Sequence, residues 1–230
     1  MKVSVAICVW KRFTNFDRIL KAWLDEKEVD EVVIWDNSGS YKTDLPGVIV
    51  VSASTNTNSK CRFLAAQLCK NDLIVIADDD FTPHPGITKD LLKHYQEERI
   101  VGIMGKQYTG ETYYESTVVM SCDIQEITRV NYLCSNLLLT HRKHCIGLDI
   151  QKIPSSIIDD MWWEHELEVD GVTCWVIPTN KWTMNQDGKY EFAHHLHPAM
   201  KILREYYFRK WIKGSNEEPP SILNDRSKLP

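Results

Sequence analysis

Three consecutive aspartates, Asp78, Asp79 and Asp80, directly follow the apolar residues 73–77. Adjacent carboxylates repel one another, so a fold has little reason to gather them unless a cation compensates. Mg²⁺ and Mn²⁺ prefer oxygen ligands and commonly bridge one or two carboxylates to substrate phosphates. A solvated acidic turn is the simpler alternative for an isolated Asp-Asp-Asp. A position just after a strand, where open α/β sheets bind ligands, favours a metal site.

A second acidic pair, Asp159 and Asp160, begins a helix predicted over residues 157–169. A carboxylate placed there can accept the proton of an acceptor hydroxyl as a general base. Acidic residues are also favoured in a first helical turn by the helix dipole, which is a purely structural explanation. Two tryptophans follow, of which Trp162 fits the apolar stripe of the helix. We therefore expect Trp163 to be the one that contacts a ligand.

Basic residues and one further carboxylate follow other predicted strands. Arg12 comes after the first strand, while Lys60 and Arg62 begin the helix that precedes residues 73–77. Cations at these places could bind a diphosphate. Asp36 ends the second strand and could accept a hydrogen bond from a nucleobase or a ribose hydroxyl. Ordinary surface charges, and an Asx turn at Asp36, are the plainer interpretations.

Three histidines lie within four residues near the end of the chain, at His194, His195 and His197. An imidazole can supply a nitrogen ligand to a divalent ion, so we predict His195 as a metal ligand beside Asp80 and Asp78. A zinc site fits less well, because no cysteine or second histidine pair has suitable spacing. A surface histidine cluster is the alternative.

Alternating strand and helix patterns would position these groups. Strands are predicted at residues 3–10, 31–35, 48–51, 73–77, 100–104, 130–139 and 174–177. Helices are predicted around residues 16–23, 63–68, 87–95, 157–169 and 198–211, with Thr14 and either Asn58 or Ser59 as caps of the first two. This alternation predicts one α/β domain with a mostly parallel sheet and helices on both faces.

The domain is expected to span residues 1–213. Residues 1–105 would form its nucleotide-binding half and residues 106–213 its acceptor-binding half. Residues 214–230, with three prolines and many polar side chains, are predicted to be a loosely held tail.

The bulk composition, 43% hydrophobic and 26% charged, is typical of a soluble globular protein. A formal charge of -5 gives no global attraction to nucleic acid or to acidic membranes. The seven cysteines include no Cys-x-x-Cys pair, so we expect reduced, buried and inert thiols rather than a zinc or redox site. No apolar run approaches the roughly 20 residues of a spanning helix, and the first residues lack a signal-peptide cleavage site. A cytoplasmic protein is expected.

Taken in order, these motifs resemble the GT-A glycosyltransferases, particularly the family-2 group, with some likeness to the exostosin-like enzymes. The likeness covers about residues 3–198. It is carried by the opening strand and loop at 3–12, the strand and Asp-containing turn at 32–40, the Arg segment at 60–66, the Asp-Asp-Asp strand at 73–80, the acceptor-side segments at 136–142 and 147–149, the acidic pair at 159–160, and the histidines at 194–197.

The resemblance implies a GT-A fold and a metal-dependent transfer of a sugar from a nucleotide-diphosphate sugar, expected to be a UDP-sugar, to the hydroxyl of a glycan or another acceptor. It implies Mn²⁺ or Mg²⁺ as cofactor, Asp160 as general base with Asp159 as alternate, and Asp80, Asp78 and His195 as metal ligands. The expected donor-binding residues are Trp10, Arg12, Asp36, Lys60, Arg62, Asp78 and Asp79. We expect inversion of configuration, although the exostosin-like enzymes retain it.

Two other functions fit parts of the pattern. A sugar-1-phosphate nucleotidylyltransferase has a related sheet and acidic metal ligands, but such enzymes normally carry a Gly-rich loop after the first strand, and residues 10–13 contain no glycine. A non-catalytic sugar-nucleotide-binding module would keep the fold, but the intact acids at residues 78–80 and 159–160 speak against it.

The predicted C-terminal helix interleaves basic and aromatic residues over residues 201–213. Such a helix could touch a membrane surface, an anionic glycan or DNA. Packing of its apolar side on the core is the plainer account. No obligate protein partner is evident from the sequence.

Overall fold

A computed structural model describes residues 1–185 and 199–224, and in this part of the chain one eight-stranded sheet dominates. Its strand order is β3-β2-β1-β4-β11-β6-β12-β9. All of these strands point the same way except β11 and β9, which run antiparallel to their neighbours. Their bounds are β1 Val3–Val9, β2 Val29–Asp36, β3 Val48–Ser52, β4 Leu73–Asp78, β6 Arg99–Gly102, β9 Thr128–Val130, β11 Leu137–His141 and β12 Thr173–Val176. The predicted α/β class with a mostly parallel sheet is confirmed.

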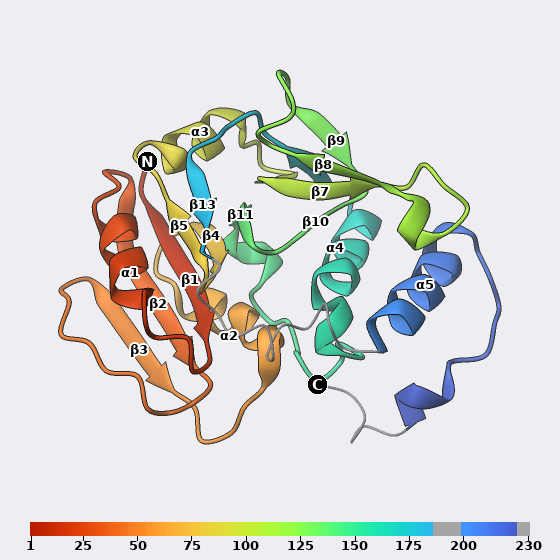
Figure 1. The fold of residues 1–230 in the computed structure, drawn as a ribbon, viewed down its shortest axis with the longest axis horizontal. Coiled ribbons are helices and arrows are strands. Elements are labelled where there is room, and N and C mark those ends of the chain that lie inside the picture. The colour runs from red at the N-terminus through yellow and green to blue at the C-terminus, as the bar shows by residue number, and fades with distance from the viewer. Residues whose placement is uncertain (186–198, 225–230) are drawn as a thin grey trace.

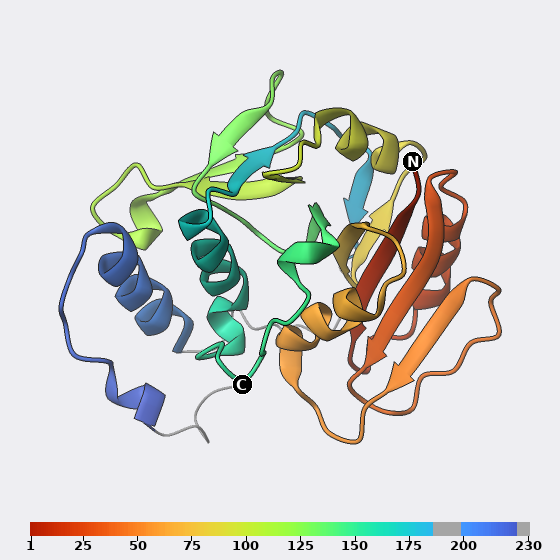
Figure 2. The same cartoon turned by 180° about the vertical axis from the view of Figure 1, so that it is seen from behind.

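Helices cover both faces of this sheet, as Figures 1 and 2 show from opposite sides. α1 (Phe16–Leu24) and α3 (Ile87–His94) pack on one face. α2 (Cys61–Leu68) and α4 (Asp159–Val169) pack on the other. Strands covered on both faces must be apolar on both sides, which explains why the predicted central strands are uninterrupted apolar runs. The prediction of helices on both faces is confirmed.

Alternation along β1 divides its side chains between the two layers. Val5 and Ile7 belong to the core beneath α1 and α3, whereas Ala6 belongs to the core beneath α2 and α4. Phe16 and Trp23 of α1 are fully buried, as the helical stripe predicts. The centre of the sheet is therefore closely packed on both faces. Within it, β1 and β4 are neighbouring parallel strands whose carboxyl ends lie side by side at one edge of the sheet.

Smaller elements complete the fold. A three-stranded antiparallel sheet has the order β10-β7-β8, and β13 pairs with β5. Their bounds are β5 Phe81–Pro83, β7 Met104–Gln107, β8 Thr117–Met120, β10 Tyr132–Leu133 and β13 Trp182–Met184. Helix α5 (Ala199–Ile212) lies beside α4 in both views, and its buried residues share a third core cluster with Met161 of α4 (Figures 1 and 2). None of β5, β8 and β13 is predicted from the sequence.

Two predicted strands are divided in the structure. Residues 130–139 do not form one strand, because β9, β10 and β11 pair with three different partners, β12, β7 and β4. Residues 100–104 likewise split at Ile103, whose N–H bonds to the Leu137 carbonyl. In both cases the chain leaves one sheet for another, a change that apolar periodicity does not reveal.

The expected helix caps are wrong. No side-chain hydrogen bond caps α1 or α2. The first N–H of α1, that of Phe16, bonds to the Phe13 carbonyl instead. A 3-10 turn, Asn58–Lys60, leads into α2, and the Cys61 N–H bonds to carbonyls of that turn. Backbone carbonyls therefore satisfy the donors that side-chain caps were expected to satisfy.

Within the expected tail, Ser221–Asn224 form a short 3-10 turn. Among the described residues, no helix combines the length and the apolar character needed to cross a membrane.

Candidate functional site

The acidic site begins where β4 ends. Asp78 is the last residue of β4 and pairs in register with Cys8 of β1. Asp79 and Asp80 continue the chain toward β5. Arg12, in the loop after β1, holds both of these carboxylates, at 2.7 Å from Asp79 Oδ1 and 2.6 Å from Asp80 Oδ2. The two strand ends therefore bring the predicted triad and one predicted cation together.

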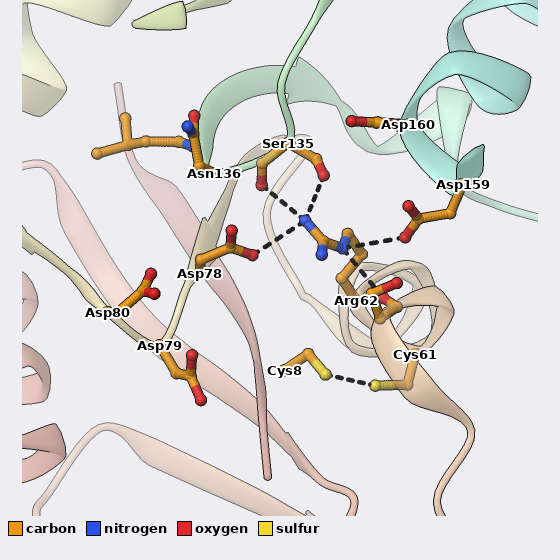
Figure 3. A network of polar contacts seen from close by, with 12 residues as sticks. Cys8, Cys61, Arg62, Asp78, Asp79, Asp80, Ser135, Asn136, Asp159 and Asp160 are labelled. Carbon is orange, nitrogen blue, oxygen red and sulfur yellow. Dashed lines mark hydrogen bonds and ion pairs between the residues drawn. The ribbon is translucent and has the colours of Figure 1, made fainter. Parts of the chain in front are cut away.

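Arg62 joins the triad to the second acidic pair (Figure 3). Its Nη1 lies 3.0 Å from Asp78 Oδ1, and its Nε lies 3.5 Å from Asp159 Oδ2. The same buried guanidinium donates to the Ser59 carbonyl at 3.0 Å and to the Ser135 carbonyl at 2.8 Å. One side chain from α2 thus connects the end of β4 with the first turn of α4 and with the segment before β11.

Asp160 makes a separate buried ion pair. Its two carboxylate oxygens accept hydrogen bonds from Arg204 Nη2 of α5 at 3.0 and 3.3 Å. Arg204 Nη1 donates to the hydroxyls of Tyr113 and Tyr132, both at 2.9 Å. Only 6% of Asp160 and 7% of Arg204 is exposed, so this pair is removed from water. Loss of either partner strongly destabilises the protein, because the other charge is left buried without compensation.

The cluster carries more negative than positive charge. Five carboxylates, at residues 78, 79, 80, 159 and 160, face three guanidiniums, at residues 12, 62 and 204. Fully ionised, the group has an excess of 5 − 3 = 2 negative charges. A divalent cation carries the charge that would balance it, so the excess fits one bound Mg²⁺ or Mn²⁺.

The pKa values of the acids reflect burial and this excess. Burial, together with the charges of Asp80 and Asp78, raises the pKa of Asp79 to about 7 against the opposing effect of Arg12. Burial, followed by the charge of Asp78, also raises the pKa of Asp80. The pKa of Asp159 rises to about 6 because its burial outweighs the nearby Arg62. Near neutral pH the cluster therefore holds protons that a cation could replace.

The oxygen donors fit a hard metal ion in part. Side-chain exposure is 32% for Asp78 and 26% for Asp80, so both carboxylates can be reached. The Oδ1 atom of Asp80 is buried and has no hydrogen-bond partner among the described residues. Across residues 1–185 and 199–224, no three His, Cys, Asp or Glu side chains are arranged to hold a metal. His195, the predicted third ligand, lies outside the described residues, as do His194 and His197.

Asp36 is engaged by its own turn. It is fully buried, and Oδ1 accepts hydrogen bonds from the Ser38 N–H at 2.8 Å and the Ser38 hydroxyl at 2.6 Å, while Oδ2 accepts from the Tyr41 N–H at 2.7 Å. This is the Asx-type turn that the sequence allows as an alternative. Contact of Asp36 with a nucleobase stays a prediction.

Trp10 directly follows β1, and Lys60 is the last residue of the turn before α2. Trp10 is half-buried, with Lys11 Nζ 4.7 Å from the centre of its ring. Lys60 Nζ donates to the Ile153 carbonyl at 3.0 Å. Both residues border the loops that follow β1 and precede Arg62, and their contact with a donor stays a prediction.

The expectation for Trp163 is wrong. Only 1% of this side chain is exposed, and its indole N–H donates to the His144 carbonyl at 2.9 Å. Trp163 packs in the core beneath α2 and α4, with its ring 5.1 Å from that of Phe63. Trp162 is the half-buried member of the pair. Ile158 and Met161 are buried as the apolar stripe predicts, and Trp162 packs partly buried against two core clusters.

The role of Arg204 is not predicted from the sequence. It lies four residues before Phe208 and three before Tyr207, both buried, and so shares the inward side of α5. An arginine on the apolar side of a helix signals a buried acidic partner, since long charged side chains are almost never fully buried unless they are paired. That signal was present in the sequence, while the partner could be identified only from the fold.

No protein-family model matches this chain, and no curated protein matches it. The chemistry of the acidic cluster is therefore the basis for a functional proposal.

Proposed function

We propose that this protein is a metal-dependent glycosyltransferase of the GT-A type. It transfers a sugar from a nucleotide-diphosphate sugar, with a UDP-sugar as the expected donor, to an acceptor hydroxyl. The observation that carries the proposal is that Arg62 joins Asp78 of the acidic triad to Asp159 of the acidic pair, at the edge of the sheet where β1 and β4 end. Ligands of open α/β sheets bind at such edges, beyond the carboxyl ends of the strands.

The donor side is formed by the first half of the chain. Asp78 and Asp80 are the carboxylates that would hold Mn²⁺ or Mg²⁺, together with the predicted ligand His195. When bound, the divalent ion neutralises negative charge on the leaving diphosphate. Arg12, which is one-third exposed beside Asp79 and Asp80, would bind a diphosphate oxygen.

The acceptor side is formed by the start of α4. The acceptor oxygen attacks the anomeric carbon, the bond from that carbon to the diphosphate breaks, and the acceptor proton moves to a carboxylate. Asp159 suits this role better than Asp160, which the sequence favours. The pKa of Asp159, raised to about 6 chiefly by burial, is close to the working range of a general base. Asp160 is instead held at both oxygens by Arg204.

A panel of nucleotide sugars with Mn²⁺ tests the proposal, scored by release of nucleoside diphosphate and by the shift of the melting temperature. Asp80→Ala should abolish metal-dependent release, whereas Asp44→Ala, in an exposed loop, should leave it unchanged. Full activity of the Asp80→Ala protein with the metal chelated would end the proposal. Proton NMR of the first-formed product gives its anomeric configuration, for which inversion is expected.

A second function, a non-catalytic sugar-nucleotide-binding module, is favoured by one observation. Both candidate bases, Asp159 and Asp160, are buried and paired with arginines. A binding module would show a melting shift with a nucleotide sugar and Mn²⁺ but no release of nucleoside diphosphate with any acceptor. The same panel therefore separates the two functions.

A further inference from the structure

Two cysteines touch beneath the acidic cluster. Cys8 lies in β1 and Cys61 is the first residue of α2, and their Sγ atoms are 2.7 Å apart. Figure 3 shows both thiols pointing toward each other below Arg62. All seven cysteines of the chain are free in the structure. This contact is shorter than the usual separation of non-bonded sulfurs and is within about 0.7 Å of the disulfide bond length of ~2.05 Å.

The surrounding chain holds the two sulfurs in this position. Asn37 Nδ2 donates to Cys61 Sγ at 3.1 Å, to Cys8 Sγ at 3.4 Å and to the Asn58 carbonyl at 3.0 Å. Asn37 Oδ1 in turn accepts from the Thr57 N–H at 3.0 Å. The Cys61 thiol donates to the Asn58 carbonyl at 2.9 Å. The end of β2 and the turn before α2 thus fix the positions of both thiols.

Cys8 carries its proton in this contact. The pKa of Cys8 is raised well above its ordinary value, first by the hydrogen bond with Cys61 and then by burial. Cys8 is therefore a thiol at neutral pH, and no charge repulsion separates it from Cys61. Cys8 is partly exposed, whereas Cys61 is fully buried, so an oxidant reaches Cys8 first.

We propose that Cys8 and Cys61 are a redox pair that forms an intramolecular disulfide with a low-molecular-weight disulfide, such as oxidised glutathione, as oxidant. The Cys8 sulfur, after losing its proton, attacks the small disulfide and releases one small thiol, leaving a mixed disulfide on Cys8. The Cys61 sulfur then attacks the Cys8 sulfur and releases the second small thiol. Two protein thiols are oxidised to one disulfide, and one small disulfide is reduced to two thiols.

The bond would connect the redox state of the protein with the acidic cluster. Cys8 is the register partner of Asp78. Cys61 directly precedes Arg62 in the chain, and Arg62 forms ion pairs with Asp78 and Asp159. Closing the bond ties the first turn of α2 to β1 directly beneath these ion pairs. The proposal does not depend on the glycosyltransferase function, because it concerns the thiols alone.

The test is equilibration of the full chain in glutathione buffers of increasing oxidised fraction, followed by acid quenching, alkylation and peptide mass mapping. The protein should lose two alkylatable thiols, and residues 8 and 61 should appear in one disulfide-linked peptide pair. Reduction should reverse this. Cys122→Ser, which removes an exposed thiol, should behave as the parent, whereas Cys8→Ser and Cys61→Ser should lose the linked pair.

The oxidised protein should also melt higher than the reduced protein, by roughly 5–10 °C, because the bond closes a loop of about 50 residues. Absence of the 8–61 linked peptides from the parent chain at the most oxidising ratio would overturn the proposal, whether or not the serine variants fold. Linked peptides of Cys69 and Cys145 forming as readily would also overturn it, since that outcome would reflect unfolding of the core.

Discussion

Neutralising Asp79 should make the metal-free protein more stable at pH 8. Asp79 is 6% exposed, and its pKa is raised from 3.8 to about 7 by burial and by Asp80 and Asp78. A shift of about three pH units corresponds to about 4 kcal/mol between the two protonation states. A raised carboxyl pKa contributes stability that is fully present below the unfolded value of 3.8. That stability is lost as the pH rises through about 7.

The measurement is the free energy of unfolding in urea at pH 5 and pH 8, in the presence of a chelator, for the parent and for Asp79→Asn. The asparagine keeps the shape of the protonated acid, so the variant should exceed the parent by about 1–2 kcal/mol at pH 5 and by about 4 kcal/mol at pH 8, because the parent's unfolded state already releases the Asp79 proton at pH 5. The unfolding free energies of the two proteins must be compared with each other at each pH, because His144 changes the stability of both with pH in the direction opposite to Asp79. Its pKa is lowered to about 4 by burial, which makes stability rise with pH over the acid range.

Adding Mn²⁺ at pH 8 should reverse part of the parent's loss. A ligand that binds only the native state at one hundred times its dissociation constant adds about 2.7 kcal/mol. At pH 5 the same Mn²⁺ should add less, because protons compete for the carboxylates. An Asp79→Asn protein that is no more stable than the parent at pH 8 would refute the charge-excess reasoning, and so would an Mn²⁺ effect that is larger at pH 5.

Three further changes probe how the fold supports the site. Arg204→Met should cost about 3–5 kcal/mol by leaving Asp160 buried without a partner, and Asp160→Asn added to it should restore part of the loss, both measured by urea unfolding. Trp163→Ala should cost about 3–5 kcal/mol because the side chain is core, and a loss of ligand affinity without a loss of stability would contradict this. Gly105→Ala should destabilise by about 1–3 kcal/mol in thermal melts, because the new Cβ would lie 2.6 Å from the Tyr132 carbonyl oxygen.

The first half of the fold could be predicted from the sequence because its signals are local. Residues 73–77 are apolar on both faces, which is typical of a central parallel strand, and β4 occupies that position. Phe16 and Trp23 recur at helical spacing, and α1 buries both. The carboxyl ends of such strands meet at one edge, so the neighbourhood of Arg12 and Asp80 followed from the order of elements alone.

The second half could not be predicted in the same way, because its elements are defined by distant partners. β9, β10 and β11 lie within a single apolar stretch, and only their pairing with three different strands separates them. Trp163 and Trp162 are adjacent in a helix with apolar residues on several sides, so periodicity could not decide which one points inward. The Arg204–Asp160 pair joins α5 to α4 across 44 residues.

The ion pairs and the sheet together show why the two predicted halves of the chain form one site. β11, from the second half, lies between β4 and β6 of the first half, so the edge that carries Asp78 is completed only when residues 137–141 are in place. Arg62 then joins Asp78 to Asp159 across the same boundary. The clustered acids therefore do not depend on a metal alone for charge balance. Three arginines compensate most of the charge of the five carboxylates. The remaining excess of two negative charges arises only when both halves of the chain contribute their carboxylates. Neither half alone would therefore hold a divalent ion as the whole chain is proposed to do.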